Sequence, residues 1–186
     1  MSRIPRISPA ALTDEQRGLY ESITAGPRAR NPFGIVHPDG TLAGPFNAML
    51  LTPPVGDALQ RLGAALRHGG ELSDRARELA ILMVAASRES GYEQFAHEHV
   101  GRQLELTDDE ITALREGREP ELADPEEQAI VATTRRLVDN GKLTDEDYAD
   151  AVSKLGAAKL FELSTVVGYY QLIAMQLHVF GVDRPQ

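Results

Sequence analysis

Three residues that can carry proton-transfer chemistry share one stripe of a predicted helix. Glu93 and His97 lie four positions apart, and Ser90 lies three positions before Glu93, so on a helix their side chains project from one face. The stripe continues through Val100 and Leu104, which predicts that it turns toward the core. Ionisable side chains are costly to bury unless they pair or take part in chemistry, so this stripe is a candidate site.

Another ionisable residue, Glu78, belongs to the predicted helix before it. Its neighbours at helical spacing are apolar, so Glu78 is also expected to face inward. A short break near residues 87–90 makes the two helices antiparallel neighbours, and we expect Glu78, Glu93 and His97 to converge. His97 is the natural proton-transferring group because the unperturbed pKa of histidine is about 6.5. Either glutamate could orient its ring and hold it protonated.

Two other interpretations of these residues are weaker. Glu78, Glu93 and His97 could supply ligands to zinc or iron, but the sequence has no H-E-x-x-H motif. Ser90 could act as a nucleophile only beside a base, and His97 lies two turns further along the same helix. A helix cap or a pocket hydroxyl is the favoured role for Ser90. His99 falls on the opposite side of the helix and is interpreted as a surface or interface residue.

The rest of the sequence predicts an all-α protein that positions these residues. Thr13, Ser73, Thr107 and Thr144 each precede acidic residues at capping spacing and are predicted helix starts. Gly156 is predicted to separate the last two helices. Strand-like alternation is absent. The helix over 73–86 is apolar nearly all round, which predicts that part of its surface is buried between subunits.

An irregular segment, residues 27–45, holds four prolines and three glycines. Loops of this length in compact domains are often functional. This loop could lie on a neighbouring subunit or form one wall of a pocket through His37, and the sequence leaves both possibilities open. Arg28 and Arg30 in the loop, and Arg77 in the later helix, are candidates for binding a substrate anion.

Length, charge and composition narrow the function further. At 186 residues the chain is expected to be one domain, with residues 1–45 as an arm, helix and loop extension. Its net charge of −9 argues against nucleic acid and anionic membranes as partners. The N-terminus has no apolar signal-peptide core and no segment is long and apolar enough to span a bilayer, so a cytoplasmic location is expected. With 0 cysteines, disulfides, thiolate metal sites and cysteine nucleophiles are excluded.

The candidate residues also carry a family resemblance. The spacing of Glu78, Ser90, Glu93 and His97 resembles the E-x11-C-x2-C-x3-H signature of the alkylhydroperoxidase D and carboxymuconolactone decarboxylase superfamily, with Ser90 and Glu93 replacing both cysteines. The run from Tyr92 to His97 is similar to the Y-E-W-x-x-H pattern of the decarboxylase branch, although a glutamine stands where tryptophan is common. The resemblance covers most of the chain after about residue 45.

This resemblance implies an all-α, alkylhydroperoxidase D-like fold that assembles as trimers or hexamers and uses no metal and no cofactor. The peroxidase branch requires its dithiol, which a chain with 0 cysteines lacks. The decarboxylase branch acts on γ-carboxymuconolactone in aromatic catabolism, so a small lactone or carboxylic acid is the expected partner. A non-catalytic, oligomeric small-molecule-binding protein of the same fold is the alternative. The expected residues are Glu78, Glu93 and His97 for catalysis and Ser90, Tyr92, His37 and Arg77 for substrate binding.

Overall fold

The computed structural model of the protein describes residues 2–26 and 34–184, and within them the regular elements are helices. In these residues the only extended pairing is an isolated antiparallel bridge between Val36 and Leu42, so the all-α prediction is confirmed. The elements in chain order are a 3₁₀ turn η1 (Pro9–Ala11) and the helices α1 (Asp14–Ala25), α2 (Phe46–Met49), α3 (Pro53–His68), α4 (Asp74–Ser87), α5 (Gly91–Gln103), α6 (Asp108–Arg115), α7 (Pro125–Asn140) and α8 (Asp145–Phe180).

The helix boundaries follow from local capping. Thr13 and Thr107 each form the reciprocal capping box that their sequences predict. Ser73 accepts a hydrogen bond from the amide of Ala76 and begins α4. Gly141, with φ of 67°, takes the left-handed conformation that ends α7. These local signals fix where the helices of the site begin and end.

The described chain divides into two compact units. Residues 1–69 with 175–186 form the first unit, and Gly70–Ala174 form the second. In the first, the side chain of Asn47 bonds both the amide of Ile7 at 2.9 Å and the carbonyl of Pro5 at 3.1 Å, which ties the N-terminal arm to α2. The second unit contains α4 to α7 and most of α8, and it holds the predicted site. A single functional domain over residues 1–186 stays a prediction.

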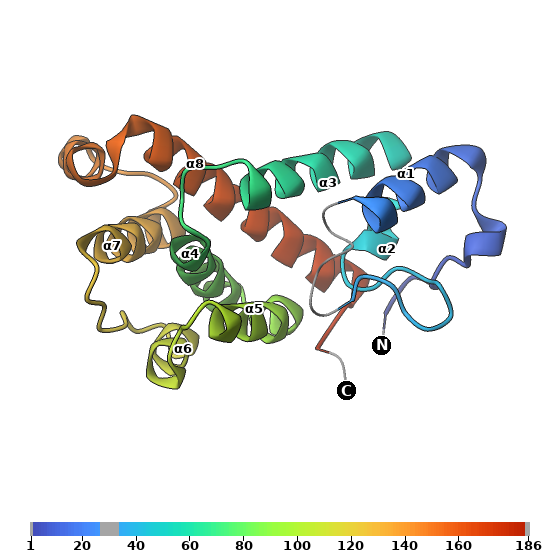
Figure 1. Ribbon diagram of the computed structural model, residues 1–186, viewed down its shortest axis with the longest axis horizontal. Helices are drawn as coiled ribbons and strands as arrows, with labels where there is room; N and C mark the ends of the chain where they lie inside the picture. The colour runs from blue at the N-terminus through green and yellow to red at the C-terminus, as the bar shows by residue number, and fades with distance from the viewer. Residues whose placement is uncertain (1, 27–33, 185–186) are drawn as a thin grey trace. The chain divides into compact units, whose positions relative to one another are not determined.

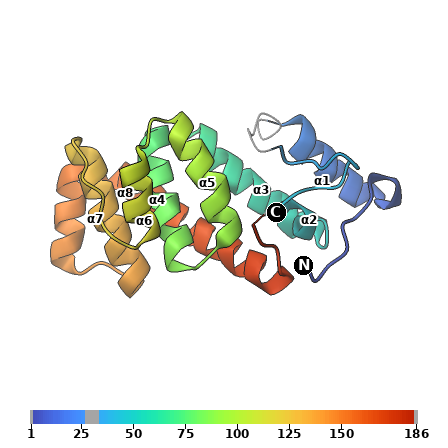
Figure 2. The same ribbon diagram turned by 90° about the horizontal axis from the view of Figure 1, so that it is seen from below.

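Helix α4 is the centre of the second unit. Its residues Ala76–Ala85 are buried, and it packs against α5, α6 and α7 (Figure 1 and Figure 2). Leu79, Leu82 and Met83 contribute to one cluster with apolar side chains from the neighbouring segments. The expectation that another subunit covers this helix is therefore wrong, because helices of the same chain already cover its apolar surface.

Helix α8 is bent and anchors the start of α4. Gly156, with φ of 78° and ψ of 160°, interrupts it, as predicted, and the orange part of the ribbon changes direction in Figure 1. Beyond the bend, the carboxylate of Glu162 accepts the amides of Glu71 at 2.6 Å and Leu72 at 3.1 Å. This buried carboxylate holds the segment that leads into α4. Among the described helices, none combines the length and apolar character needed to cross a lipid bilayer.

Candidate active site

A tight connection places α5 beside α4. The amide of Ser90 donates to the carbonyl of Ala85 at 2.9 Å, and Glu89 takes a positive φ of 50°. Ser90 is then the N-cap residue of α5, although its side chain makes no capping hydrogen bond. Because so few residues join the helices, they run antiparallel, and residues near the middle of α4 face the second turn of α5.

Glu78 of α4 and His97 of α5 meet in this hairpin. His97 Nδ1 and Glu78 Oε2 are 2.6 Å apart, with 10% and 1% of the two side chains exposed. An ionised carboxylate only accepts hydrogen bonds, so the imidazole donates from Nδ1. Within the described residues the ring makes no second hydrogen bond, which leaves Nε2 available for proton exchange with a ligand.

A tyrosine from α8 packs against the ring of His97. The Tyr170 ring lies edge-on to the imidazole, with ring centroids 5.1 Å apart, and Tyr169 packs against Tyr170 at 5.2 Å. Both tyrosines are buried. Sequence reasoning missed them because they lie far along the chain in an apolar helix. Two adjacent tyrosines in that largely apolar helix were the available signal.

Glu93, one turn before His97, is buried differently from Glu78. Glu93 is 3% exposed and Ser90 is 2% exposed, and neither side chain has a hydrogen-bond partner of ordinary geometry in the described residues. Removing a carboxylate from water without a partner costs several kcal/mol, whereas a position in the first helical turn favours the charge by at most about 2 kcal/mol. Burial therefore dominates and raises the pKa of Glu93 to about 8, opposed by the nearby Ser90 hydroxyl.

The structure separates the roles that the sequence left open between the two glutamates. Of the two glutamates, Glu78 is hydrogen-bonded to the His97 ring, and in the described residues no hydrogen bond joins Glu93 to it. Tyr92 is partly buried beside Glu93, and burial, followed by the Glu93 charge, raises the pKa of its phenol to about 12. Tyr92 is therefore a neutral hydroxyl at physiological pH.

Other predicted binding residues do not join this cluster through any contact that the structure describes. Arg77 is buried, but its guanidinium bonds the carboxylate of Asp74 and the carbonyl of Leu72, at the start of its own helix. His37 belongs to the first unit, where its amide donates to Thr41 at 2.8 Å. Arg28 and Arg30 lie outside the described residues. Their roles in binding an anion stay predictions.

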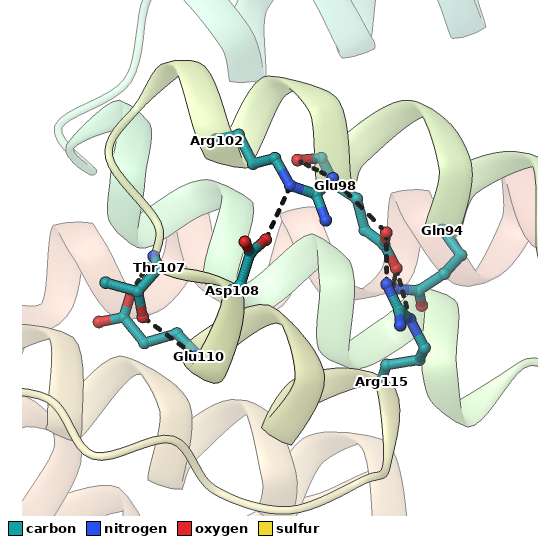
Figure 3. Close-up of polar contacts among 7 residues, drawn as sticks. All are labelled: Gln94, Glu98, Arg102, Thr107, Asp108, Glu110 and Arg115. Atoms are coloured by element: carbon teal, nitrogen blue, oxygen red, sulfur yellow. Dashed lines mark hydrogen bonds and ion pairs between the residues drawn. The ribbon is translucent and has the colours of Figure 1, made fainter.

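A separate polar network holds α5 against α6. Glu98 accepts a two-pronged contact from Arg115 at 2.6 and 2.7 Å and a hydrogen bond from Gln94 at 2.7 Å (Figure 3). Further along, Arg102 pairs with Asp108 at 3.0 Å. This network lies on a different side of α5 from His97, so it fixes the helix without occupying the candidate site. In the described part of the chain, no group of three or more potential ligands is placed to hold a metal ion.

Comparison with known proteins matches the segment that contains the candidate site to a protein family. Residues 53–136, which include Glu78, Ser90, Glu93 and His97, match the carboxymuconolactone decarboxylase family. The matched segment is a member of that family. The chain has 0 cysteines in its 186 residues, so this match is to a cysteine-free sequence. No curated protein matches the chain.

Solved structures with the same fold include proteins of different stated activity. The chain is similar to the alkylhydroperoxidase AhpD core of an uncharacterized peroxidase-related protein from Ralstonia eutropha JMP134, with TM-score 0.76 and 16% identity over 100% of this chain and 93% of the other. A peroxidase-related protein from Silicibacter sp. TM1040 has TM-score 0.74 and 14% identity, over 97% and 90% of the two chains. The debrominase Bmp8 in complex with 2,3,4-tribromopyrrole has TM-score 0.71 and 10% identity, over 99% and 90%. At these identities the likeness establishes the alkylhydroperoxidase D-like fold.

Proposed function

We propose that this protein catalyses cofactor-independent decarboxylation, or a closely related proton transfer, on a small lactone or carboxylic acid from aromatic catabolism. The observation that carries the proposal is the buried pair of His97 and Glu78, 2.6 Å apart, in a chain without cysteine. Family membership over residues 53–136 supports the same chemistry. The fold of the debrominase holds a small halogenated ring in its complex, which supports a small cyclic substrate for the fold.

The reaction needs one proton and a place for an electron pair. When the bond between the lactone carbon and its carboxylate breaks, carbon dioxide leaves and the electron pair delocalises into the conjugated carbonyl, which forms a dienolate. His97 then donates the Nε2 proton to carbon and takes a proton back from solvent. Proton transfer by a positioned side chain typically contributes about 10²–10⁴-fold to the rate.

Glu78 acts through His97 in this scheme. Its carboxylate holds the Nδ1 proton and so directs Nε2 toward the substrate. It also stabilises the imidazolium form that donates the proton. The edge-on contact with Tyr170 limits the movement of the ring further. Glu78 is therefore a positioning residue, and His97 is the proposed catalytic residue.

Decarboxylation is tested by following carbon dioxide release from γ-carboxymuconolactone and from a panel of β-keto and vinylogous acids. The pure wild-type protein should release carbon dioxide from at least one of these compounds above the uncatalysed rate. His97→Gln should lose about 10²-fold or more while it retains helical content. The matched control is His99→Gln, an exposed histidine on the same helix, which should keep its turnover. Equal activity in wild type and His97→Gln would refute the assignment.

A further inference from the structure

Three buried oxygen atoms at the start of α5 lack hydrogen-bond partners of ordinary geometry in the described residues, although the Ser90 hydroxyl lies close enough to Glu93 to lower the pKa of its carboxyl group. They are Ser90 Oγ and both carboxyl oxygens of Glu93. Buried polar groups in folded proteins are nearly always satisfied, so an unsatisfied cluster of this kind calls for a partner that is not part of the chain. His97, one turn further on the same face, also has a ring nitrogen without a partner among these residues. The open hydrogen-bonding positions therefore collect at one place.

The surrounding groups do not supply a counter-charge to Glu93. On α4, Glu78 is bound to His97. On α8, Tyr170 contacts the imidazole ring. Arg115 of α6 is paired with Glu98, on a different side of α5. Glu93 makes no ion pair in the described residues, so burial leaves its carboxyl group neutral at physiological pH.

A neutral carboxyl group has a different use from an ionised one. It can donate a hydrogen bond through its O–H, whereas a carboxylate only accepts. A neutral group also avoids the repulsion that a second carboxylate, beside Glu78, would impose on an anionic ligand. The Ser90 hydroxyl adds a second donor at the same end of the helix.

We propose that Glu93 is a neutral acid that, together with Ser90, donates hydrogen bonds to a carbonyl or carboxylate oxygen of the substrate. This inference rests on the proposed function and names the substrate class at that site, a molecule whose oxygen acceptor sits about one helical turn from the carbon that His97 protonates. As carbon dioxide leaves, negative charge gathers on the oxygen of the conjugated carbonyl, and the Glu93 O–H and Ser90 O–H stabilise it there. The Glu93 proton is shared in the hydrogen bond and not consumed, while His97 supplies the proton to carbon.

The charge state of Glu93 is tested without any substrate. The full-length protein is labelled with ¹³C at the glutamate side-chain carboxyl carbons, and its NMR signals are followed with pH in wild type and in Glu93→Gln. One signal, missing from the variant, should stay that of a neutral acid at pH 7 and ionise near the pKa of about 8. A Glu93 signal already ionised at pH 7 would overturn the inference. This readout is independent of whether the protein releases carbon dioxide.

Ligand recognition is tested with sorbate, a small conjugated carboxylate, by calorimetric titration. Wild type should bind sorbate at pH 6 and lose about tenfold in affinity for each pH unit above the Glu93 pKa, because only the neutral acid binds the anion. Glu93→Gln keeps a donor and should bind sorbate with little change over the same pH range. Glu89→Gln, an exposed glutamate just before α5, serves as the matched control and should follow wild type. Absence of sorbate binding, or the same pH dependence in Glu93→Gln, would overturn the inference.

The turnover of Glu93 variants distinguishes a role of Glu93 in ligand binding from a structural role. With whichever acid the wild type decarboxylates, Glu93→Ala should lose about 10²–10³-fold in kcat, the usual effect of removing one donor to a developing oxyanion. Glu93→Gln should stay within about tenfold of wild type, because its amide still donates. A larger loss in Glu93→Gln than in Glu93→Ala would show that the charge is needed and would contradict the inference. If no acid is turned over, the proposed function fails, and the NMR and sorbate titrations still decide this one.

Discussion

Burial of Glu93 links the stability of the fold to pH. Its pKa rises from 4.5 in the unfolded chain to about 8 in the fold, so between these values the folded state binds a proton that the unfolded state has released. Stability from this group is therefore full below about pH 4.5 and is lost as pH rises through about 8. The same burial that prepares Glu93 to donate a hydrogen bond thus destabilises the protein at alkaline pH.

Glu93→Gln should remove this pH dependence. Between pH 5 and pH 8 the free energy of unfolding of wild type should fall relative to the variant by up to about 1.4 kcal/mol per pH unit, the value of one proton. Urea denaturation of both proteins at pH 5, 6.5 and 8 measures the difference. Parallel stability curves over this range would show that Glu93 ionises normally.

The same substitution at Glu78 should have a different outcome. Glu78→Gln replaces the carboxylate that holds His97 Nδ1 at 2.6 Å with a neutral amide, so the imidazolium form loses its counter-charge. We expect kcat to fall by about 10²-fold or more, with little change in KM, because Glu78 acts through His97 and not on the substrate. Steady-state kinetics on the acid that wild type turns over measures both values. A rise in KM at unchanged kcat would assign Glu78 to binding instead.

At the scale of helices, two glycines of α8 should respond in opposite directions to alanine. Gly156 sits at the bend with φ of 78° and ψ of 160°, a region that side chains with a Cβ rarely adopt, so Gly156→Ala should cost about 1–3 kcal/mol. At Gly168, in the regular part of α8, a Cβ would meet no atom within 4 Å. Gly168→Ala should therefore stabilise the helix by about 0.5–1 kcal/mol.

Thermal and urea unfolding of the two variants, compared with wild type, test this contrast. The shared helix and the shared substitution make each variant the control for the other. Stabilisation by Gly156→Ala would mean that α8 runs straight through this position in solution.

Helix boundaries were predictable because they depend on short-range chemistry. The capping residues Thr13 and Thr107, the stop at Gly141 and the break at Gly156 all lie where local propensity places them. Helix α4 was harder to interpret, because an all-round apolar pattern indicates burial but does not say what covers it. Packing by α5, α6 and α7 of the same chain supplies the answer.

Part of the candidate site was also predictable from the sequence. The four-residue spacing of Glu93 and His97 predicted one buried face, and both side chains are buried. Which glutamate contacts His97 depends on how α4 and α5 pack, and spacing along the chain does not determine that. Tyr170 reaches the imidazole only through the long-range packing of α8, so no local pattern near His97 could have identified it.

For the whole molecule, assembly into a homo-oligomer stays a prediction with a different structural basis. Helix α4 is covered by helices of its own chain and cannot contact another subunit. On α8, however, Phe161 is 75% exposed and Leu172 is 36% exposed. Thr165 and Gly168 lie between them at alternating spacings of four and three residues, the repeat of helices that pack side by side. We therefore expect copies of this chain to associate through α8.

Phe161→Glu should weaken that association. A charge on the exposed stripe of α8 would have to be desolvated in the assembly, so the variant should dissociate at concentrations where wild type stays assembled. Multi-angle light scattering measures the mass of both proteins. Tyr148→Glu, which replaces another exposed aromatic residue of α8, is the control and should leave the mass unchanged. A monomeric wild type would contradict the prediction.

This chain has no cysteine, so it lacks the thiol groups on which peroxidases of this kind depend. Two of the structurally similar proteins are described as peroxidase-related, and the superfamily peroxidases that the sequence resembles reduce hydroperoxides with a dithiol. Reduction of a hydroperoxide by such a pair requires a thiolate to attack the peroxide oxygen and a second thiol to close the disulfide. This chain has Ser90 and Glu93 at those positions and 0 cysteines in total.

Wild type should therefore consume no hydroperoxide in the presence of a thiol reductant beyond the rate of heat-denatured protein. The double variant Ser90→Cys with Glu93→Cys restores a C-x-x-C pair at the start of α5, beside His97, and provides a matched positive test. We expect it to form a disulfide with peroxide, because a thiol near a histidine and a helix N-terminus has a lowered pKa and reacts as the thiolate. Peroxidase activity in wild type would require a reactive group that neither Ser90, Glu93 nor His97 provides, and would refute the assignment of this site to proton transfer alone.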